Sequence, residues 1–173
     1  MRSIVNALER LTSGVGYAVS ILIVPLIAAI CYEVFARYVF GAPTIWAFEL
    51  GYSAMGVHFL LGSALTLKRG GHIRIDVIYD RFSPKTKAAI DLFFYVVLLL
   101  PFLVLLSYWM LGYALDAFAS GERTGQSAWN PVIWPFRILI SSGIVLLTVQ
   151  VVAEILKCVL TVFFDVDDAG REA

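Results

Sequence analysis

Charged residues are absent from four long stretches of this chain, and most of them lie in the segments between. Residues 15–32, 50–67, 92–115 and 138–153 contain no Asp, Glu, Lys or Arg. None of these stretches alternates polar with apolar positions, and none shows the polar stripe of a helix in a water-soluble protein. A bilayer core is about 30 Å thick, which about 20 residues of α-helix can cross. The pattern therefore predicts four transmembrane helices.

We expect an all-α integral membrane protein with one four-helix membrane domain at residues 1–164 and an acidic cytoplasmic tail at 165–173. The helices are predicted near residues 14–40, 45–67, 88–118 and 131–164. At 1.5 Å per residue these helices are long for a perpendicular crossing, so we expect them to be tilted. Pro101 is expected to kink the third helix.

The segment before the first helix has an amphipathic pattern. Within residues 2–12, Ile4, Leu8 and Leu11 share one helical face, and the charged side chains lie elsewhere. This pattern is typical of a short interfacial helix on the inner leaflet. A frayed terminus explains it equally well, and both interpretations are kept.

Basic residues are distributed unevenly, although the thirteen Lys and Arg balance thirteen Asp and Glu. If the N-terminus is cytoplasmic, only three basic residues lie on the outer side of the membrane: Arg37, Arg123 and Arg137. The positive-inside rule therefore predicts that both termini are cytoplasmic. Arg137 is expected to reach toward the interface from the start of the fourth helix.

Composition leaves no room for a second, water-soluble domain. Hydrophobic residues make up 60% of the 173 positions. The longest segment outside the predicted helices is residues 68–87, which is too short to bury a core of its own. The basic inner loop is explained as a topology determinant that meets membrane lipid. No nucleic-acid partner is expected.

The second predicted helix carries small residues on two of its faces. One face contains Ala47, Gly51, Ala54 and Gly62 together with His58, and the other contains Glu49, Ser53, Gly56 and Ser63. Small residues let helices approach closely within lipid. We therefore expect this helix to be held between neighbours.

Three charged residues flank the turn between the first two helices. Arg37 follows Glu33 by four residues, and the turn at 41–44 brings Glu49 near. A carboxylate in a membrane is costly unless it is paired or used, so Glu33 and Glu49 are candidate proton or cation sites. A Glu33–Arg37–Glu49 cluster that holds the hairpin satisfies all three charges, and we favour it. Alternatively, Arg37 faces a soluble partner on the outer side.

Other chemistry finds little support in the sequence. The two histidines, His58 and His72, lie fourteen residues apart, roughly 21 Å along a helix, so one haem cannot bridge them. His58 is expected to be packed and hydrogen-bonded across helices. Asp91 and Glu154 are expected to be solvated at the inner interface. We expect no enzymatic activity, bound metal or cofactor, because no nucleophile–base pair or metal-ligand spacing is present.

Two stretches resemble one known family. Residues 37–43, Arg-Tyr-Val-Phe-Gly-Ala-Pro, are followed by Trp46 and Glu49, and residues 68–76 read Lys-Arg-Gly-Gly-His-Ile-Arg-Ile-Asp. This chain is similar in these motifs, in length and in helix order to the small membrane subunit, or DctQ component, of tripartite ATP-independent periplasmic (TRAP) transporters. Positions in the second motif that carry the resemblance are Gly70, Gly71, His72, Arg74 and Asp76.

The resemblance implies a location in the bacterial inner membrane and a set of partners. A large membrane subunit would carry the substrate and sodium sites and move in an elevator fashion, and a periplasmic protein would capture the substrate, usually an organic acid. The small subunit would act as a scaffold for the large one and would help to dock the binding protein. Two other functions are kept as alternatives: an autonomous small exporter that works through a membrane Glu, and a membrane redox subunit.

Overall fold

A computed structural model of the chain describes residues 2–70 and 82–164. Its helices are α1 (Arg2–Ile21), α2 (Ile23–Tyr38), α3 (Ala47–Lys68), α5 (Pro84–Phe94), the π-helix η1 (Tyr95–Leu99), α6 (Leu100–Ser120) and α7 (Trp134–Phe164). They form four candidate membrane spans, because α1 continues into α2, and α5 continues through η1 into α6. The predicted four-helix membrane architecture is confirmed.

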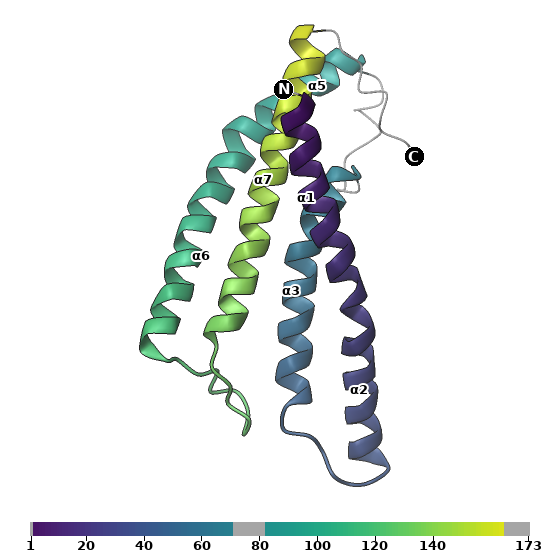
Figure 1. Ribbon diagram of the computed structural model, residues 1–173, viewed down its shortest axis with the longest axis vertical. Helices are drawn as coiled ribbons and strands as arrows, with labels where there is room; N and C mark the ends of the chain where they lie inside the picture. Colours follow the sequence, from purple (N-terminus) through teal and green to yellow (C-terminus); the bar gives the residue numbers. More distant parts are fainter. Residues whose placement is uncertain (1, 71–81, 165–173) are drawn as a thin grey trace.

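The two ends of the bundle differ (Figure 1). The start of α1, α5 and the end of α7 gather at one end, so the first and last described residues lie on the same side. Toward the opposite end the bundle opens into two arms, one made of α2 and α3 and the other of α6 and α7. The two loops at residues 39–46 and 121–133 lie at this open end, which we call the outer end.

The first span is divided, whereas the sequence pattern predicted one helix at 14–40. Leu22 separates α1 from α2, and its backbone N–H bonds to the carbonyl of Val19, three residues back. Pro25 has no N–H to donate to Ile21, which removes one α-helical bond at this point. The separate helix or frayed end expected at 2–12 is instead the first part of α1, since Val5 and Thr12 are buried against the bundle.

The third span departs from α geometry close to Pro101. The N–H of Leu100 bonds to the carbonyl of Tyr95, five residues back, which closes a π-helical turn. Pro101 cannot donate to Val97, so the backbone widens by one residue instead of leaving that turn strained. Pro101 therefore changes the helix geometry one turn ahead of its own position, while the kink expected there stays a prediction.

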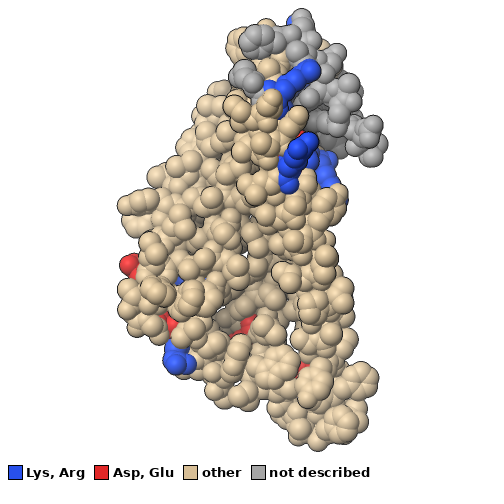
Figure 2. All heavy atoms as spheres, in the orientation of Figure 1, with Lys and Arg blue, Asp and Glu red and all other residues tan. Residues whose placement is uncertain are grey.

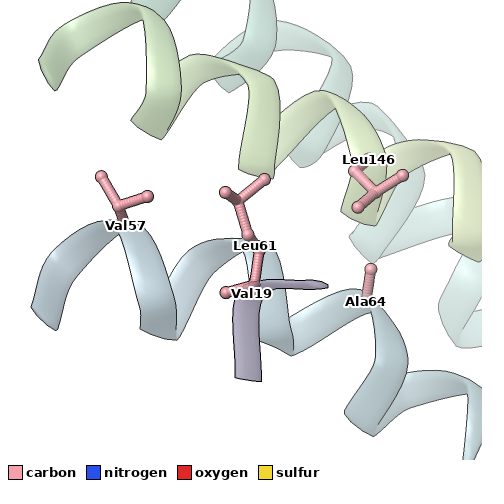
Figure 3. Close-up of a cluster of buried hydrophobic side chains, with 5 residues drawn as sticks. All are labelled: Val19, Val57, Leu61, Ala64 and Leu146. Carbon is pink, nitrogen blue, oxygen red and sulfur yellow. The ribbon is translucent and has the colours of Figure 1, made fainter. Parts of the chain in front are cut away.

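Helix α3 lies between α1 and α2 on one side and α7 on the other, as predicted. One hydrophobic cluster joins Val57, Leu61 and Ala64 of α3 to Val19 of α1 and Leu146 of α7 (Figure 3). The closest approaches come from glycines on the neighbours. A Cβ on Gly16 of α1 would lie 2.7 Å from the Leu65 side chain. Gly62 on α3 itself meets nothing within 4 Å.

Large apolar side chains cover the outward faces of the helices. On α3, Phe48, Met55 and Phe59 are each about 70% exposed. Tyr38 of α2 and Trp109 of α6 are exposed to a similar extent. In water such surfaces would be unfavourable, whereas lipid or another membrane protein covers them without penalty.

Candidate functional site

The first hairpin is closed by a single carboxylate, Glu33. One of its oxygens accepts hydrogen bonds from the backbone N–H of Thr44, at 2.8 Å, and from the Thr44 hydroxyl. The other oxygen accepts bonds from the Arg37 guanidinium, one turn further along α2. Gly41, at φ +61°, provides the left-handed turn that reverses the chain. The predicted Glu33–Arg37 pair is confirmed.

Trp46 adds an aromatic contact to the same hairpin. It occupies the position before the first residue of α3, and its ring stacks on Tyr32 of α2 with centroids 6.3 Å apart and planes 16° from parallel. Together with Glu33, this contact sets the separation of α2 and α3 at the outer end. Arg37 keeps half of its side chain exposed there.

The predicted pair between Arg37 and Glu49 is wrong. Glu49 is only 1% exposed, and it accepts a hydrogen bond of 2.8 Å from the hydroxyl of Thr124, in the loop between α6 and α7. α3 begins at Ala47, so Glu49 lies in its first turn on the side that faces this loop, away from Arg37. The second oxygen of Glu49 has no hydrogen-bond partner among the residues that the structure describes.

Glu49 lines a slot between the two arms of the bundle, with a volume of about 520 Å³. In the view of Figure 2, the surface between the two arms is hollowed, and acidic atoms are visible on the floor of the hollow. The walls are apolar and come from α2, α3, the outer loop and the start of α7; they include Leu22, Leu26, Val57, Trp129, Val132 and Phe136. Besides the indole of Trp129, the polar side chains that line the slot are those of Glu49, Ser53 and Thr124.

A second charge cluster braces the other arm. Arg137, near the start of α7, is 6% exposed, and its two terminal nitrogens donate to the two carboxylate oxygens of Glu122 at 2.6 and 2.7 Å. It also donates to the hydroxyl of Tyr113 on α6. The bond from Arg137 holds the pKa of Glu122 below its ordinary value, because the carboxylate form is the better acceptor. Arg137 is thus held inside the protein, with its guanidinium on a carboxylate of the loop between α6 and α7.

The outer loop between α6 and α7 folds back on itself. Arg123 and Val132 form an isolated antiparallel bridge, and the N–H of Ile133 bonds to the carbonyl of Glu122. The Asn130 side chain accepts from the N–H of Gly125. This folding carries Thr124 to Glu49, and α7 consequently begins at Trp134 instead of residue 131.

At the opposite end, a partly buried charge network joins α1, α3 and α7. The ammonium of Lys157 lies 2.6 Å from Glu154 and 2.9 Å from Glu9. Gln150 donates to Glu154, and Lys68 donates to Ser13 beside Glu9. Glu154 is 3% exposed, so the expectation that it is solvated is wrong. Its charge is balanced by Lys157 from the same helix face.

The other residues singled out by the sequence are His58 and those of the motif at residues 70–76. His58 is half-buried on α3, and no hydrogen bond joins it to any described residue, so the expected bond across helices is not formed. Gly70, at φ +67°, follows the end of α3, and this left-handed conformation ends the helix. Gly71, His72, Arg74 and Asp76 lie outside the described residues. No group of three or more potential metal ligands occurs in the described part of the chain.

Sequence reasoning missed the residues that pair across long distances in the chain. Thr124 is separated from Glu49 by 75 residues, and Glu122 from Arg137 by 15. The only available signal was that Arg137 needs a nearby acid, for which Glu122 is the first one upstream. Nothing in the sequence pointed from Glu49 to Thr124.

Comparison with known proteins agrees with this architecture. A family model described as tripartite ATP-independent periplasmic transporters, DctQ component, matches residues 26–161. The match covers all of α3, α5, α6 and most of α2 and α7. No curated protein matches the chain.

Proposed function

The chain belongs to the DctQ component family of tripartite ATP-independent periplasmic transporters, and we propose that it is the scaffold subunit of a sodium-coupled importer of an organic acid. In this proposal a large membrane subunit binds substrate and sodium and moves like an elevator. The small subunit gives its static part a wide, rigid support, and a periplasmic binding protein delivers the substrate.

The observation that carries this proposal is the pairing of two basic residues inside the bundle, the buried Arg137 and the partly buried Lys157. Arg137 is held by Glu122, and Lys157 is held by Glu9 and Glu154. An organic acid anion needs a cation or a cluster of donors to replace its water. Both of these cations are already paired with carboxylates. This arrangement supports a bracing role for this subunit, and in our proposal another subunit binds the substrate.

The outer surface is suited to a soluble partner. The hairpin that contains Arg37 and Trp46 and the loop at residues 121–133 lie together at the open end of the bundle. In our proposal this end faces the periplasm and helps to dock the binding protein. Lys and Arg atoms gather mainly at the opposite end (Figure 2), which supports a cytoplasmic position for that end and for both termini. Membrane lipid then surrounds the exposed apolar faces.

Reconstitution tests this function directly. Proteoliposomes would contain the large subunit with or without the small subunit, with the binding protein and a labelled organic acid outside and an inward sodium gradient. We expect uptake only when all three proteins are present, and no uptake with the small subunit alone. Full transport by the large subunit without this chain, or uptake by this chain alone, would contradict the proposal.

A further inference from the structure

Glu49 is a buried carboxylate that the described residues leave incompletely paired. One oxygen accepts from Thr124, and the other has no partner. The basic residues of the outer half are engaged elsewhere: Arg37 with Glu33, Arg137 with Glu122, and Arg123 with the carbonyl of Asn130. A buried carboxylate without a counter-charge is strongly destabilising. Glu49 therefore needs a hydrogen-bond donor that the described residues of this chain do not supply.

Polar and apolar side chains lie at different depths of the slot that contains Glu49. Glu49 and Thr124 lie at the outer end, and from there α3 runs inward to Val57, about 12 Å at 1.5 Å per residue. The inner part is lined by apolar residues such as Leu22, Leu26 and Val57. A ligand that fits this order has an apolar stem at membrane depth and a cationic head that reaches outward.

The slot has room for side chains that enter through its mouth. Side chains from a helix that lies across the mouth of the slot would fill it. Lys and Arg have the required shape, because their aliphatic stems follow apolar surface while the charged head reaches toward the interface.

Two other occupants fit less well. A phospholipid with an ammonium head would place its phosphate between that head and its acyl chains, in the apolar part of the slot, where no described lining residue is cationic. A bare metal cation needs about six oxygen ligands, whereas the side-chain oxygens here come from Glu49, Ser53 and Thr124.

We propose that the slot receives a Lys or Arg side chain from a membrane helix of the large subunit, and that this side chain pairs with Glu49. The inference rests on the proposed function, since it assigns one point of contact within that assembly. It makes Glu49 a residue of partner recognition, with Thr124 as the group that orients its carboxylate.

The test compares two acid-to-amide variants of the small subunit, co-expressed with the large subunit. Glu49→Gln keeps the shape of the side chain and its bond from Thr124, and it removes the charge. Asp116→Asn is the matched control, because Asp116 is an exposed acid on α6 in the same half of the molecule. We expect Glu49→Gln to raise the Kd between the purified subunits at least about tenfold. Asp116→Asn should leave the Kd unchanged.

The unfolding temperature of the isolated small subunit provides a second test, because a structural role and a recognition role for Glu49 predict different changes in it. If Glu49 serves only the internal fold, Glu49→Gln should lower the unfolding temperature of the isolated subunit. Our proposal expects an equal or higher unfolding temperature, because the variant no longer buries an uncompensated charge. Glu49→Arg should block assembly, and changing one membrane-helix Lys or Arg of the large subunit to Glu should restore it.

Several results would overturn the inference. One is a Kd for Glu49→Gln that equals the Kd for Asp116→Asn. Another is a phospholipid that native mass spectrometry finds on the wild-type subunit and not on Glu49→Gln, with the same Kd for both complexes. If the wild-type subunits bind and Glu49→Gln binds equally well, only this inference falls. If the wild-type subunits do not bind each other, the proposed function falls with it.

Discussion

Gly143 of α7 lies directly against the backbone of Leu60 on α3. A Cβ at position 143 would be 3.0 Å from the carbonyl carbon of Leu60 and 3.0 Å from its Cβ. Because one of these atoms belongs to the backbone, it cannot move aside as the end of a flexible side chain would. The absence of a side chain at Gly143 therefore sets how closely the two central helices approach.

We expect Gly143→Val to separate α3 from α7 and to destabilise the subunit by about 1–3 kcal/mol, the usual range for overpacking. Thermal unfolding of the purified protein in detergent would measure the effect. Gly112→Val on α6 is the matched control, because a Cβ at Gly112 meets nothing within 4 Å. Equal unfolding temperatures for the two variants would contradict the tight contact.

The Glu122–Arg137 pair predicts a pH dependence. The pKa of Glu122 is lowered in the folded protein, so the pair stabilises the fold above the ordinary value of 4.5 and loses this contribution as pH falls through the lowered value. Wild type should therefore unfold at a higher temperature than Glu122→Gln at neutral pH, and the difference should disappear in acid. A difference that persists unchanged in strong acid would argue against the pair.

The inner network predicts a coupling between Lys157 and Glu154. Lys157→Met leaves Glu154 buried without its cation, and we expect a loss of about 3 kcal/mol. Adding Glu154→Gln removes the orphaned charge and should recover part of that loss, since contacting charges are coupled by about 0.5–3 kcal/mol. Denaturant or thermal unfolding of both single variants and the double variant measures the coupling. Additive losses would show that the two groups act independently.

The first hairpin predicts that Glu33 matters more than Arg37. Glu33→Ala removes the bonds to both Thr44 and Arg37, whereas Arg37→Ala removes only a half-exposed pair. The unfolding temperature should fall clearly further for Glu33→Ala. Exchange of charges between Arg37 and Glu49 should restore nothing, because these residues do not pair. Recovery in that double exchange would show that the hairpin is arranged differently.

Topology is open to a direct measurement. The excess of basic residues at one end predicts that a reporter fused after Gly70 is cytoplasmic and one fused after Gly121 is periplasmic. Alkaline phosphatase should then be active only in the second fusion, and green fluorescent protein should fluoresce only in the first. The reverse pattern would invert the proposed orientation of the slot and of both termini.

Much of this protein follows from its sequence by itself. Long runs without charge determine the number and type of spans, because the bilayer excludes unpaired charges and free backbone groups wherever they occur. Local rules also placed the Glu33–Arg37 pair and an irregularity of the third span near Pro101. Each of these depends on residues within about one or two turns of one another.

The tertiary structure decided which distant groups meet. Glu49 joins Thr124 and not Arg37, and Glu154 is buried beside Lys157 with Glu9 brought from α1. These pairings depend on how each helix is rotated about its axis and on how the outer loop folds back. In lipid nearly every face of these helices is apolar, so hydrophobic periodicity cannot report that rotation. Close packing at Gly16 and Gly143 sets it instead, and packing is a property of helices already in contact.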